Sequence, residues 1–246
     1  MSDSAIEFRQ VHKTFNHTPV LVGMDLAIRP AETVTIIGGS GTGKSVTLKL
    51  IVGLLKPESG QVLIEGEDIA PWTEDQLLKV RKRIGMVFQS SALFDSLSVA
   101  ENIAYPLREH TTMSEHEIRE RIRETLSLVG LEGAEEKDPS ALSGGMRKRV
   151  ALARAIVLVP RVILYDEPTT GLDPTNTKHI NELIVDMAEK LGVTSVVVTH
   201  DMRSAFKISD RIALLYKGKI AVAGTPQEIE RSDLPLVREF ISGTMA

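Results

Sequence analysis

The sequence predicts an α/β protein with an N-terminal antiparallel β subdomain and an inserted α-helical subdomain. Three observations support this fold class. The first third carries short mixed apolar and polar segments, residues 33–55 run from an apolar strand through a glycine loop into an apolar helix, and strand–helix alternation returns after a helical middle. We expect one domain over residues 1–246, in which 1–89 and 158–246 form the core with the β subdomain. Residues 90–157 would form the helical subdomain.

The N-terminal strands are predicted from segments separated by turns. These segments are "AIEFRQV" (5–11), "VLVGMDLAI" (20–28) and "QVLIEGEDI" (61–69). Their mixed patterning favours an antiparallel sheet. "TVTIIGG" (33–39) and "KSVTLKLIVGLL" (44–55) then predict a buried strand followed by a helix.

The middle of the chain is predicted to be helical. "EDQLLKVRKR" (74–83) favours one helix, and Ser114 with Glu117 forms a capping-box pair that opens a second. That second helix carries one apolar stripe and is predicted to end at Gly130. The stripe consists of Ile118, Ile122, Leu126 and Val129.

The last third returns to buried strands. "RVILYDEP" (161–168) and "TSVVVTH" (194–200) predict parallel strands, separated by a helix that begins at Pro174 and is stopped by Gly192. "RIALLYKGKIAVAG" (211–224) predicts a hairpin that turns at residues 217–218. "LPLVREFISG" (234–243) predicts a short amphipathic helix.

Composition narrows the class of protein. Hydrophobic residues make up 42% of the chain and charged residues 25%, values that are ordinary for a soluble globular protein. The net charge is -4 and no basic block stands out, so we expect no nucleic-acid partner. Because cysteine is absent, disulfides and Cys-ligated zinc are excluded. The polar start "MSDSAIEFRQ" predicts no signal peptide, and no apolar run approaches the roughly 18 residues of a membrane span.

A phosphate-binding loop is predicted at "GGSGTGKS", which fits the pattern G-x-x-x-x-G-K-[ST]. Glycines let backbone N–H groups point inward, and the positive end of the following helix favours the same anion. Lys44 would reach the β- and γ-phosphates of a nucleotide, and Ser45 would hold Mg²⁺. The alternative is a glycine-rich turn with a surface lysine, which the flanking apolar strand and helix disfavour. The expected nucleotide-binding residues here are Gly38, Gly39, Ser40, Gly41, Thr42, Gly43, Lys44, Ser45 and Val46.

Two adjacent carboxylates follow an apolar strand. Asp166 would bind Mg²⁺, and Glu167 would orient and activate the attacking water. A helix cap or a solvated turn is the alternative. Gln89 and His200 also follow predicted strands, and ligands bind beyond the carboxyl ends of such strands, so both would lie near the γ-phosphate. Phe15 would stack on adenine, with a core or loop aromatic as its alternative.

A second glycine motif, "LSGGMRKR" (142–149), completes a set that resembles the ATP-binding-cassette ATPases. The phosphate loop, Gln89, "LSGGM", "ILYDEP", "GLDP" and His200 occur in that family's order and cover nearly the whole chain. The resemblance implies an ABC-type P-loop NTPase core that hydrolyses ATP. It also implies head-to-tail packing of two copies, in which Ser143, Gly144 and Gly145 serve the partner's nucleotide. A Ser-capped helix with a solvated "RKR" face is the structural alternative, which we adopt for the three cations only.

The family's roles carry over onto matching positions. The resemblance implies that Lys44 and Ser45 bind phosphate and Mg²⁺, that Gln89 senses Mg²⁺ and the attacking water, and that Asp166 is the Mg²⁺ acid. The remaining assignments are Glu167 as catalytic base, His200 as the switch histidine, Asp173 at the dimer seam and Phe15 on adenine. Gly39 stands where the family usually has Pro.

Three features indicate a subfamily. Met146 stands where the family usually has Gln, and the other two features are "AYPLREHT" (104–111) and "LVREFISG" (236–243). These stretches resemble the ATPases of the Mla and Mce phospholipid transport type (MlaF-like). The resemblance implies phospholipid cargo and a peripheral place on the cytoplasmic face of the inner membrane. The implied partners are an MlaE-like permease, which would dock near "ALFDSLSV" (92–99), an MlaD-like MCE-domain subunit and an MlaB-like STAS-domain subunit. Some relatives carry a longer C-terminal tail that supports the STAS contact, and because this sequence ends at Ala246 that subunit stays open.

Other functions remain as alternatives. An importer or lipoprotein-release ATPase usually carries "LSGGQ" and lacks "YPLREHT". A soluble cassette ATPase acting on nucleic acid or ribosomes typically joins two cassettes or carries long coiled-coil insertions. A regulatory module without turnover would not need the full set of Lys44, Asp166, Glu167 and His200.

Overall fold

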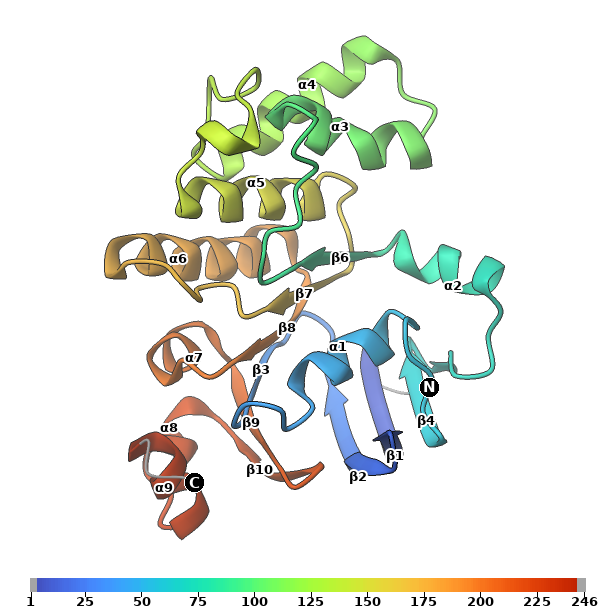
Figure 1. The fold of residues 1–246 in the computed structure, drawn as a ribbon, viewed down its shortest axis with the longest axis vertical. Coiled ribbons are helices and arrows are strands. Elements are labelled where there is room, and N and C mark those ends of the chain that lie inside the picture. The colour runs from blue at the N-terminus through green and yellow to red at the C-terminus, as the bar shows by residue number, and fades with distance from the viewer. Residues whose placement is uncertain (1–3, 243–246) are drawn as a thin grey trace.

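A computed structural model describes residues 4–242 and contains two β-sheets (Figure 1). The first is antiparallel, in the order β2-β1-β4-β5, as the sequence predicts. Its strands are β1 (Ile6–Phe15), β2 (Thr18–Ile28), β4 (Ser59–Ile64) and β5 (Glu67–Asp68). The single strand predicted over 61–69 is wrong, because Glu65 and Gly66 both adopt positive φ and turn the chain back on itself.

The second sheet has the order β10-β9-β3-β8-β7-β6. The five strands from β9 to β6 are mutually parallel, and β10 pairs antiparallel with β9. The hairpin turn at Lys217 and Gly218 is confirmed, with φ of 46° and 77°. The strands are β3 (Thr33–Ile37), β6 (Ile84–Val87), β7 (Val162–Asp166), β8 (Thr194–Thr199), β9 (Arg211–Tyr216) and β10 (Lys219–Gly224).

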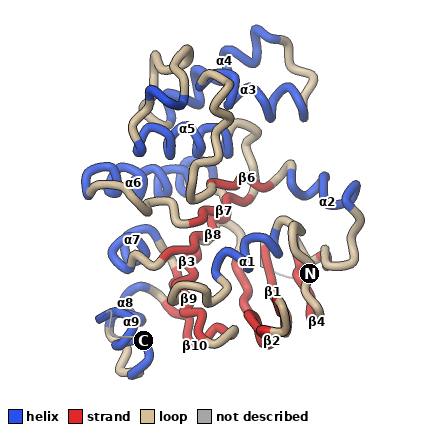
Figure 2. The backbone as a smooth tube through the Cα atoms, in the orientation of Figure 1, coloured by secondary structure: helices blue, strands red, loops and turns tan. Residues whose placement is uncertain are grey.

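Figure 2 shows α3, α4 and α5 gathered beyond β6, whereas α6 and α7 lie on one side of the parallel strands and α1 on the other. The capping box of α4 is confirmed, since Ser114 N donates to Glu117 Oε2 at 2.7 Å and Glu117 N donates to Ser114 Oγ at 3.3 Å. Gly192, with φ of 61°, ends α6 as predicted. The helices are α1 (Lys44–Ile51), α2 (Glu74–Arg81), α3 (Val99–His110), α4 (Glu115–Leu128), a 3₁₀ turn (Pro139–Ala141), α5 (Gly144–Ile156), α6 (Pro174–Leu191), α7 (Met202–Ile208), α8 (Pro226–Glu230) and α9 (Pro235–Ser242).

Both faces of the parallel sheet are buried. On β8, Val197 packs into an apolar cluster with α3 to α6, whereas Val196 and Val198 pack into a second cluster with α1 and the antiparallel sheet. This alternation follows the two-residue period of a strand. It explains why the centre of β8, Val196–Val198, is apolar on both faces.

The helices between β6 and β7 share one apolar cluster with the sheet. Ile103 of α3, Ile122 of α4 and Ile163 of β7 all belong to it. The division at residues 90 and 157 therefore stays a prediction, since no break in the core marks it. Within residues 4–242, no helix combines the length and apolarity that crossing a membrane requires. The first three residues of the polar start, the predicted helix end at residue 243 and the chain end at 246 lie outside the described residues.

Candidate nucleotide-binding site

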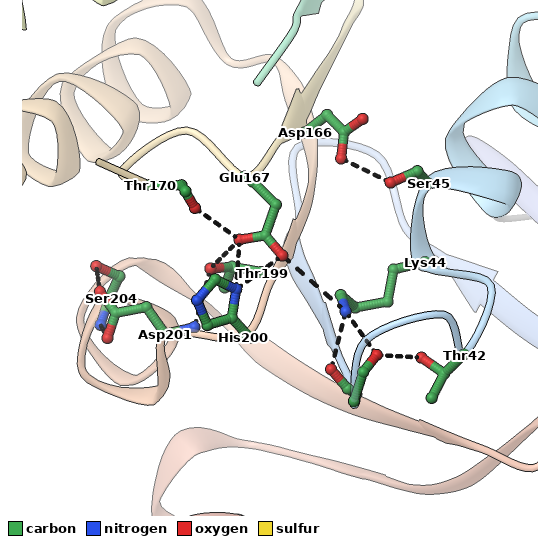
Figure 3. A network of polar contacts seen from close by, with 12 residues as sticks. Thr42, Lys44, Ser45, Asp166, Glu167, Thr170, Thr199, His200, Asp201 and Ser204 are labelled. Atoms are coloured by element: carbon green, nitrogen blue, oxygen red, sulfur yellow. Dashed lines mark hydrogen bonds and ion pairs between the residues drawn. The ribbon is translucent and has the colours of Figure 1, made fainter. Parts of the chain in front are cut away.

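Four loops that are distant in sequence meet at the carboxyl ends of neighbouring parallel strands. The loop of residues 38–43 follows β3, Asp166 and Glu167 end β7, His200 follows β8, and Gln89 follows β6. Because β3, β8, β7 and β6 are adjacent, these loops share one edge of the sheet. Figure 3 shows the side chains of the first three loops pointing toward one another. A separate hollow of about 990 Å³ lies at the opposite, amino-terminal ends of the strands and includes none of these residues.

The phosphate loop curls where only glycine fits. A Cβ on Gly38 would lie 2.7 Å from the carbonyl oxygen of Leu215. Gly43 adopts φ of 106° at the start of α1, and a Cβ there would lie 2.9 Å from Cγ1 of Val20. α1 therefore begins directly after the loop. Its first N–H groups have no partner within the helix, so they can bind an anionic group such as a phosphate.

Lys44 is a buried cation at the centre of the loop. Its Nζ donates to the carbonyl oxygens of Gly38 at 2.8 Å and Gly39 at 2.9 Å, and it lies 4.0 Å from Glu167 Oε1. Burial lowers the pKa of Lys44, while the carboxylates of Glu167 and Asp166 act in the opposite direction. The ammonium thus lies between the loop and the Glu167 carboxylate, where it can contact a nucleotide's terminal phosphates.

Ser45 and Asp166 form a pair of oxygen ligands. Ser45 Oγ donates to Asp166 Oδ1 at 2.9 Å. Hydroxyl and carboxylate oxygens suit Mg²⁺, which usually takes one or two protein groups and completes its shell with phosphates and water. The Ser45 hydroxyl and the Asp166 carboxylate therefore fit a Mg²⁺ ion that takes its other ligands from a nucleotide and water.

Glu167 is held by hydroxyl groups from two loops. Its Oε2 accepts from Thr170 Oγ1 at 3.1 Å and from Thr199 Oγ1 at 3.2 Å, and His200 Nδ1 lies 3.0 Å from Oε1 (Figure 3). Glu167 is 8% exposed, and its φ of 47° is unusual for a residue other than glycine. The carboxylate is therefore fixed in direction, as a group that orients and activates water needs to be.

The Gln89 side chain is exposed, and the hydrogen bond described for this residue is made by its main chain. Its carbonyl oxygen accepts from Lys148 Nζ at 2.5 Å, and the same ammonium lies 3.4 Å from the carbonyl oxygen of Glu167. The prediction that "RKR" forms a solvated face is therefore wrong for Lys148, which is 6% exposed. Arg149 is half-buried and donates to the carbonyl oxygen of Gly130 at 2.9 Å, so only Arg147 remains exposed. The physical reason is that α5 packs against β6, which brings Lys148 Nζ onto the carbonyl oxygens that follow β6 and β7.

The second glycine motif starts α5, as predicted. Ser143 Oγ accepts from the N–H of Met146 at 3.3 Å, and both Ser143 and Gly144 are exposed. A Cβ on Gly145 would lie 2.3 Å from Asn176 Oδ1, which shows how closely α5 approaches α6. In the view of Figure 1, α6, β7 and β8 lie between α5 and the loop before α1. Within residues 4–242, no hydrogen bond or ion pair joins 143–145 to 38–45.

Asp173 begins α6 beside this motif. Its Oδ1 accepts from the N–H groups of Thr175 at 2.9 Å and Asn176 at 3.0 Å. The Asn176 side chain is the main cause of a lowered Asp173 pKa, followed by the backbone hydrogen bonds. Asp173 is exposed, so it is available at the surface that also carries Ser143.

Phe15 ends β1 in the hairpin next to the phosphate loop. The ring is 40% exposed, and Lys13 Nζ lies 5.3 Å from its centroid. Val20, on the other strand of that hairpin, approaches Gly43, so the hairpin borders the loop. The stacking role of Phe15 stays a prediction.

Sequence reasoning missed three side chains that hold the site together. Thr199 directly precedes His200 and Thr170 follows Glu167 by three residues, so both lay within known motifs without a pattern of their own. Lys148 was hidden among three consecutive cations. A mixed polar and charged helix face gives no sign of which member points inward.

Parallel strands, a curled phosphate loop and paired carboxylates at one sheet edge define the class of P-loop nucleoside triphosphatases. Comparison with known proteins then gives the family. The sequence model described as "ABC transporter" matches residues 21–170. The chain belongs to this family and is an ATP-binding ATPase with an α/β fold of the ABC type.

Curated relatives span almost the whole chain. It is 43% identical to the "Probable ribonucleotide transport ATP-binding protein mkl" of Mycobacterium leprae, covering 97% of this chain and 69% of the relative. It is 44% identical to "TRIGALACTOSYLDIACYLGLYCEROL 3, chloroplastic" of Arabidopsis thaliana, covering 99% and 75%. It is 40% identical to the "Intermembrane phospholipid transport system ATP-binding protein MlaF" of Haemophilus influenzae, covering 99% and 92%.

A solved structure shares the fold. The ATP-binding cassette MJ0796, in a dimeric post-hydrolysis state bound to ADP and Pi, has a TM-score of 0.83 and 36% sequence identity. The match covers 90% of this chain and 98% of that one.

Proposed function

We propose that this protein is the ATPase subunit of an intermembrane phospholipid transport system. The observation that carries the proposal is the identity of 40% to MlaF, which extends over nearly the full length of both chains. The sequence features around Met146 and residues 104–111 support the same subfamily. ATP with Mg²⁺ is the substrate, and hydrolysis drives a separate membrane permease.

The chemistry follows from the geometry of the chain's own residues. Lys44 and the loop N–H groups bind and orient the phosphates, and Ser45 with Asp166 would hold Mg²⁺. When bound, Mg²⁺ neutralises charge that develops on the phosphate oxygens. Glu167 accepts the hydrogen bond of the attacking water, while Thr170, Thr199 and His200 fix the direction of its carboxylate. Asp173 would lie at the dimer interface, and Gln89 would sense Mg²⁺ and the attacking water. Phe15 would stack on the adenine.

A second copy completes each site. Ser143 and Gly144 are exposed at the start of α5 and make no hydrogen bond with their own phosphate loop among the described residues. A helix start with exposed N–H groups favours an anion. A head-to-tail pair would place this motif on the partner's nucleotide, an arrangement supported by the dimeric form of the related cassette.

The permease is expected to dock on an aromatic surface between β6 and α3. Phe94 is 44% exposed, and its ring centroid lies 5.2 Å from that of Tyr105. Phe88 is also exposed, and these three rings line a hollow of about 360 Å³. Exposed aromatic groups are typical of binding surfaces. We place the MlaE-like permease there, with MlaD-like and MlaB-like subunits as further partners, on the cytoplasmic face of the inner membrane.

Replacing the exposed ring tests this docking surface. We expect Phe94→Ala to retain ATP hydrolysis by the purified chain but to lower lipid transfer by the reconstituted complex at least about fivefold, because a central interface side chain contributes more than about 1 kcal/mol. Leu128→Ala, on the exposed face of α4, is the matched control and should leave transfer unchanged. Wild-type transfer by Phe94→Ala would exclude this surface.

The cargo is tested by isolating the protein from its native membrane with its bound partners and lipids. Co-purification of a permease and an MCE-domain subunit, together with ATP-dependent transfer of phospholipid between vesicles, is the expected result. Transfer of labelled ribonucleotide without phospholipid transfer would instead favour the cargo in the name of the mycobacterial relative. In either case Glu167→Gln serves as the transfer-dead control.

A further inference from the structure

Lys148 joins three elements through one ammonium group. It lies on α5, five residues after the helix cap Ser143. Its Nζ contacts the carbonyl oxygens of Gln89, after β6, and Glu167, after β7. The two strands are parallel neighbours whose register pairs Val87 with Tyr165. One side chain therefore ties the motif helix to the backbone of both the Gln89 loop and the catalytic carboxylate.

The charge of Lys148 needs an explanation. A lysine is almost never fully buried without a partner, and burying an ammonium is unfavourable. Among the described residues, no carboxylate lies within ion-pair distance of Lys148. An apolar side chain could fill the space without a desolvation cost. The two carbonyl contacts use N–H donors that an apolar side chain lacks.

The neighbouring cations of α5 are directed elsewhere. Arg149 donates to the carbonyl oxygens of Gly130 at 2.9 Å and Val129 at 3.3 Å, at the end of α4. Arg147 donates to the carbonyl oxygen of Leu142 at 2.6 Å, within its own segment. Lys148 is thus the member of the trio that reaches the nucleotide site, and the other two supply matched comparisons.

We propose that Lys148 is a positioning residue that couples the two nucleotide sites of a head-to-tail pair. The inference rests on the proposed function, in which Ser143–Gly145 contact the partner's nucleotide. Contact of that nucleotide with the start of α5 fixes the helix. Through Lys148, the helix then fixes the backbone of Gln89 and of Glu167 in the same subunit. Glu167 already has a strained φ of 47°, so its orientation depends on such restraints.

The test compares Lys148→Met, Lys148→Arg and Arg149→Met in the purified full chain. Rates of phosphate release are measured against ATP concentration, with ATP binding by the monomer and thermal unfolding measured in parallel. We expect Lys148→Met to lower kcat about tenfold to a hundredfold, as misplaced catalytic groups do. Its Hill coefficient should fall toward one, while ATP affinity of the monomer stays within about twofold. Lys148→Arg, which keeps the charge and N–H donors, should restore most of both kinetic values.

Arg149→Met should lower the melting temperature but keep the wild-type Hill coefficient. Wild-type kcat and Hill coefficient in Lys148→Met would overturn the proposal, as would equal loss of cooperativity in Arg149→Met. A fall in kcat that tracks the melting temperature and is not restored by Lys148→Arg would also overturn it. Failure of the proposed function would be seen in the wild-type protein itself, which would then hydrolyse ATP without cooperativity or not at all.

Discussion

In the proposed mechanism, Glu167 is the side chain on which ATP hydrolysis depends most directly. Glu167→Gln keeps the size of the side chain and an oxygen that can still accept from Thr170 and Thr199. An amide cannot accept the proton of the attacking water. We therefore expect kcat to fall about a hundredfold or more, the usual contribution of a general base, while ATP still binds. Phosphate release and equilibrium ATP binding measure the two effects separately.

Glu32 provides the matched control for that substitution. It is a buried carboxylate at the opposite end of the sheet, where its Oε1 lies 2.9 Å from Arg211 Nε. Glu32→Gln should lower the melting temperature because it weakens a buried ion pair, but it should keep kcat. Near wild-type turnover in Glu167→Gln would show that another group activates the water.

For single residues, the sequence predicts the position of a side chain when that residue directly follows a recognisable strand. Asp166, Glu167 and His200 follow apolar runs directly, so their place at the sheet edge is readable without a structure. Thr199 and Lys148 are not readable in this way. Their partners lie 32 and 59 residues away in sequence, and convergence of that kind depends on the strand order.

Among the elements, the contact between α5 and β6 connects the helical segment to the sheet. A Cβ on Gly85 would lie 2.4 Å from the carbonyl oxygen of Ala155, a backbone atom that cannot move aside alone. We expect Gly85→Ala to lower the free energy of unfolding by about 1–3 kcal/mol, the usual cost of overpacking. Urea unfolding followed by circular dichroism measures it.

Gly144→Ala is the comparison, because its Cβ would meet only Leu172 Cδ2 at an ordinary 3.6 Å. Its stability should stay within about 0.5 kcal/mol of wild type. Equal stability of the two variants would show that α5 can shift relative to β6 at little cost.

The sequence predicts best those helices and hairpins whose ends carry residues that favour a helix terminus or a turn. Pro174 and Gly192 mark α6 because each fits only one end of a helix, and Gly218 marks a hairpin because glycine adopts positive φ without strain. The turn at Glu65–Gly66 has the same pattern of positive φ angles, yet it was not predicted from the sequence. Apolar residues on both sides of that turn read as one continuous strand.

For the whole molecule, local patterns predict two sheets but not their strand order. The order β10-β9-β3-β8-β7-β6 arises from pairings between segments far apart in sequence, such as β3 with β8. The same limit applies beyond one chain. Ser143 and Lys44 are predicted as parts of one kind of site, yet within the described residues no hydrogen bond joins them. The proposed head-to-tail pair of copies would bring such groups together.

A mixing experiment tests that composite site. Lys44→Ala removes the phosphate-loop cation, and Ser143→Arg blocks the motif at the start of α5, so each variant alone should be inactive. In a head-to-tail heterodimer of the two, one site pairs the intact loop of one subunit with the intact motif of the other. Equal mixing should then restore about a quarter of wild-type sites, because half of the dimers are mixed and each has one intact site of two.

The measurement is phosphate release after mixing, with each variant alone at the same total concentration as the control. Ser143→Arg should also bind ATP as a monomer with near wild-type affinity, because the motif does not contact its own phosphate loop. Loss of that affinity would place Ser143 in the site of its own chain. If the mixture forms ATP-dependent dimers but releases no phosphate, a single complete site cannot hydrolyse ATP. Phosphate release by either variant alone would exclude the shared site.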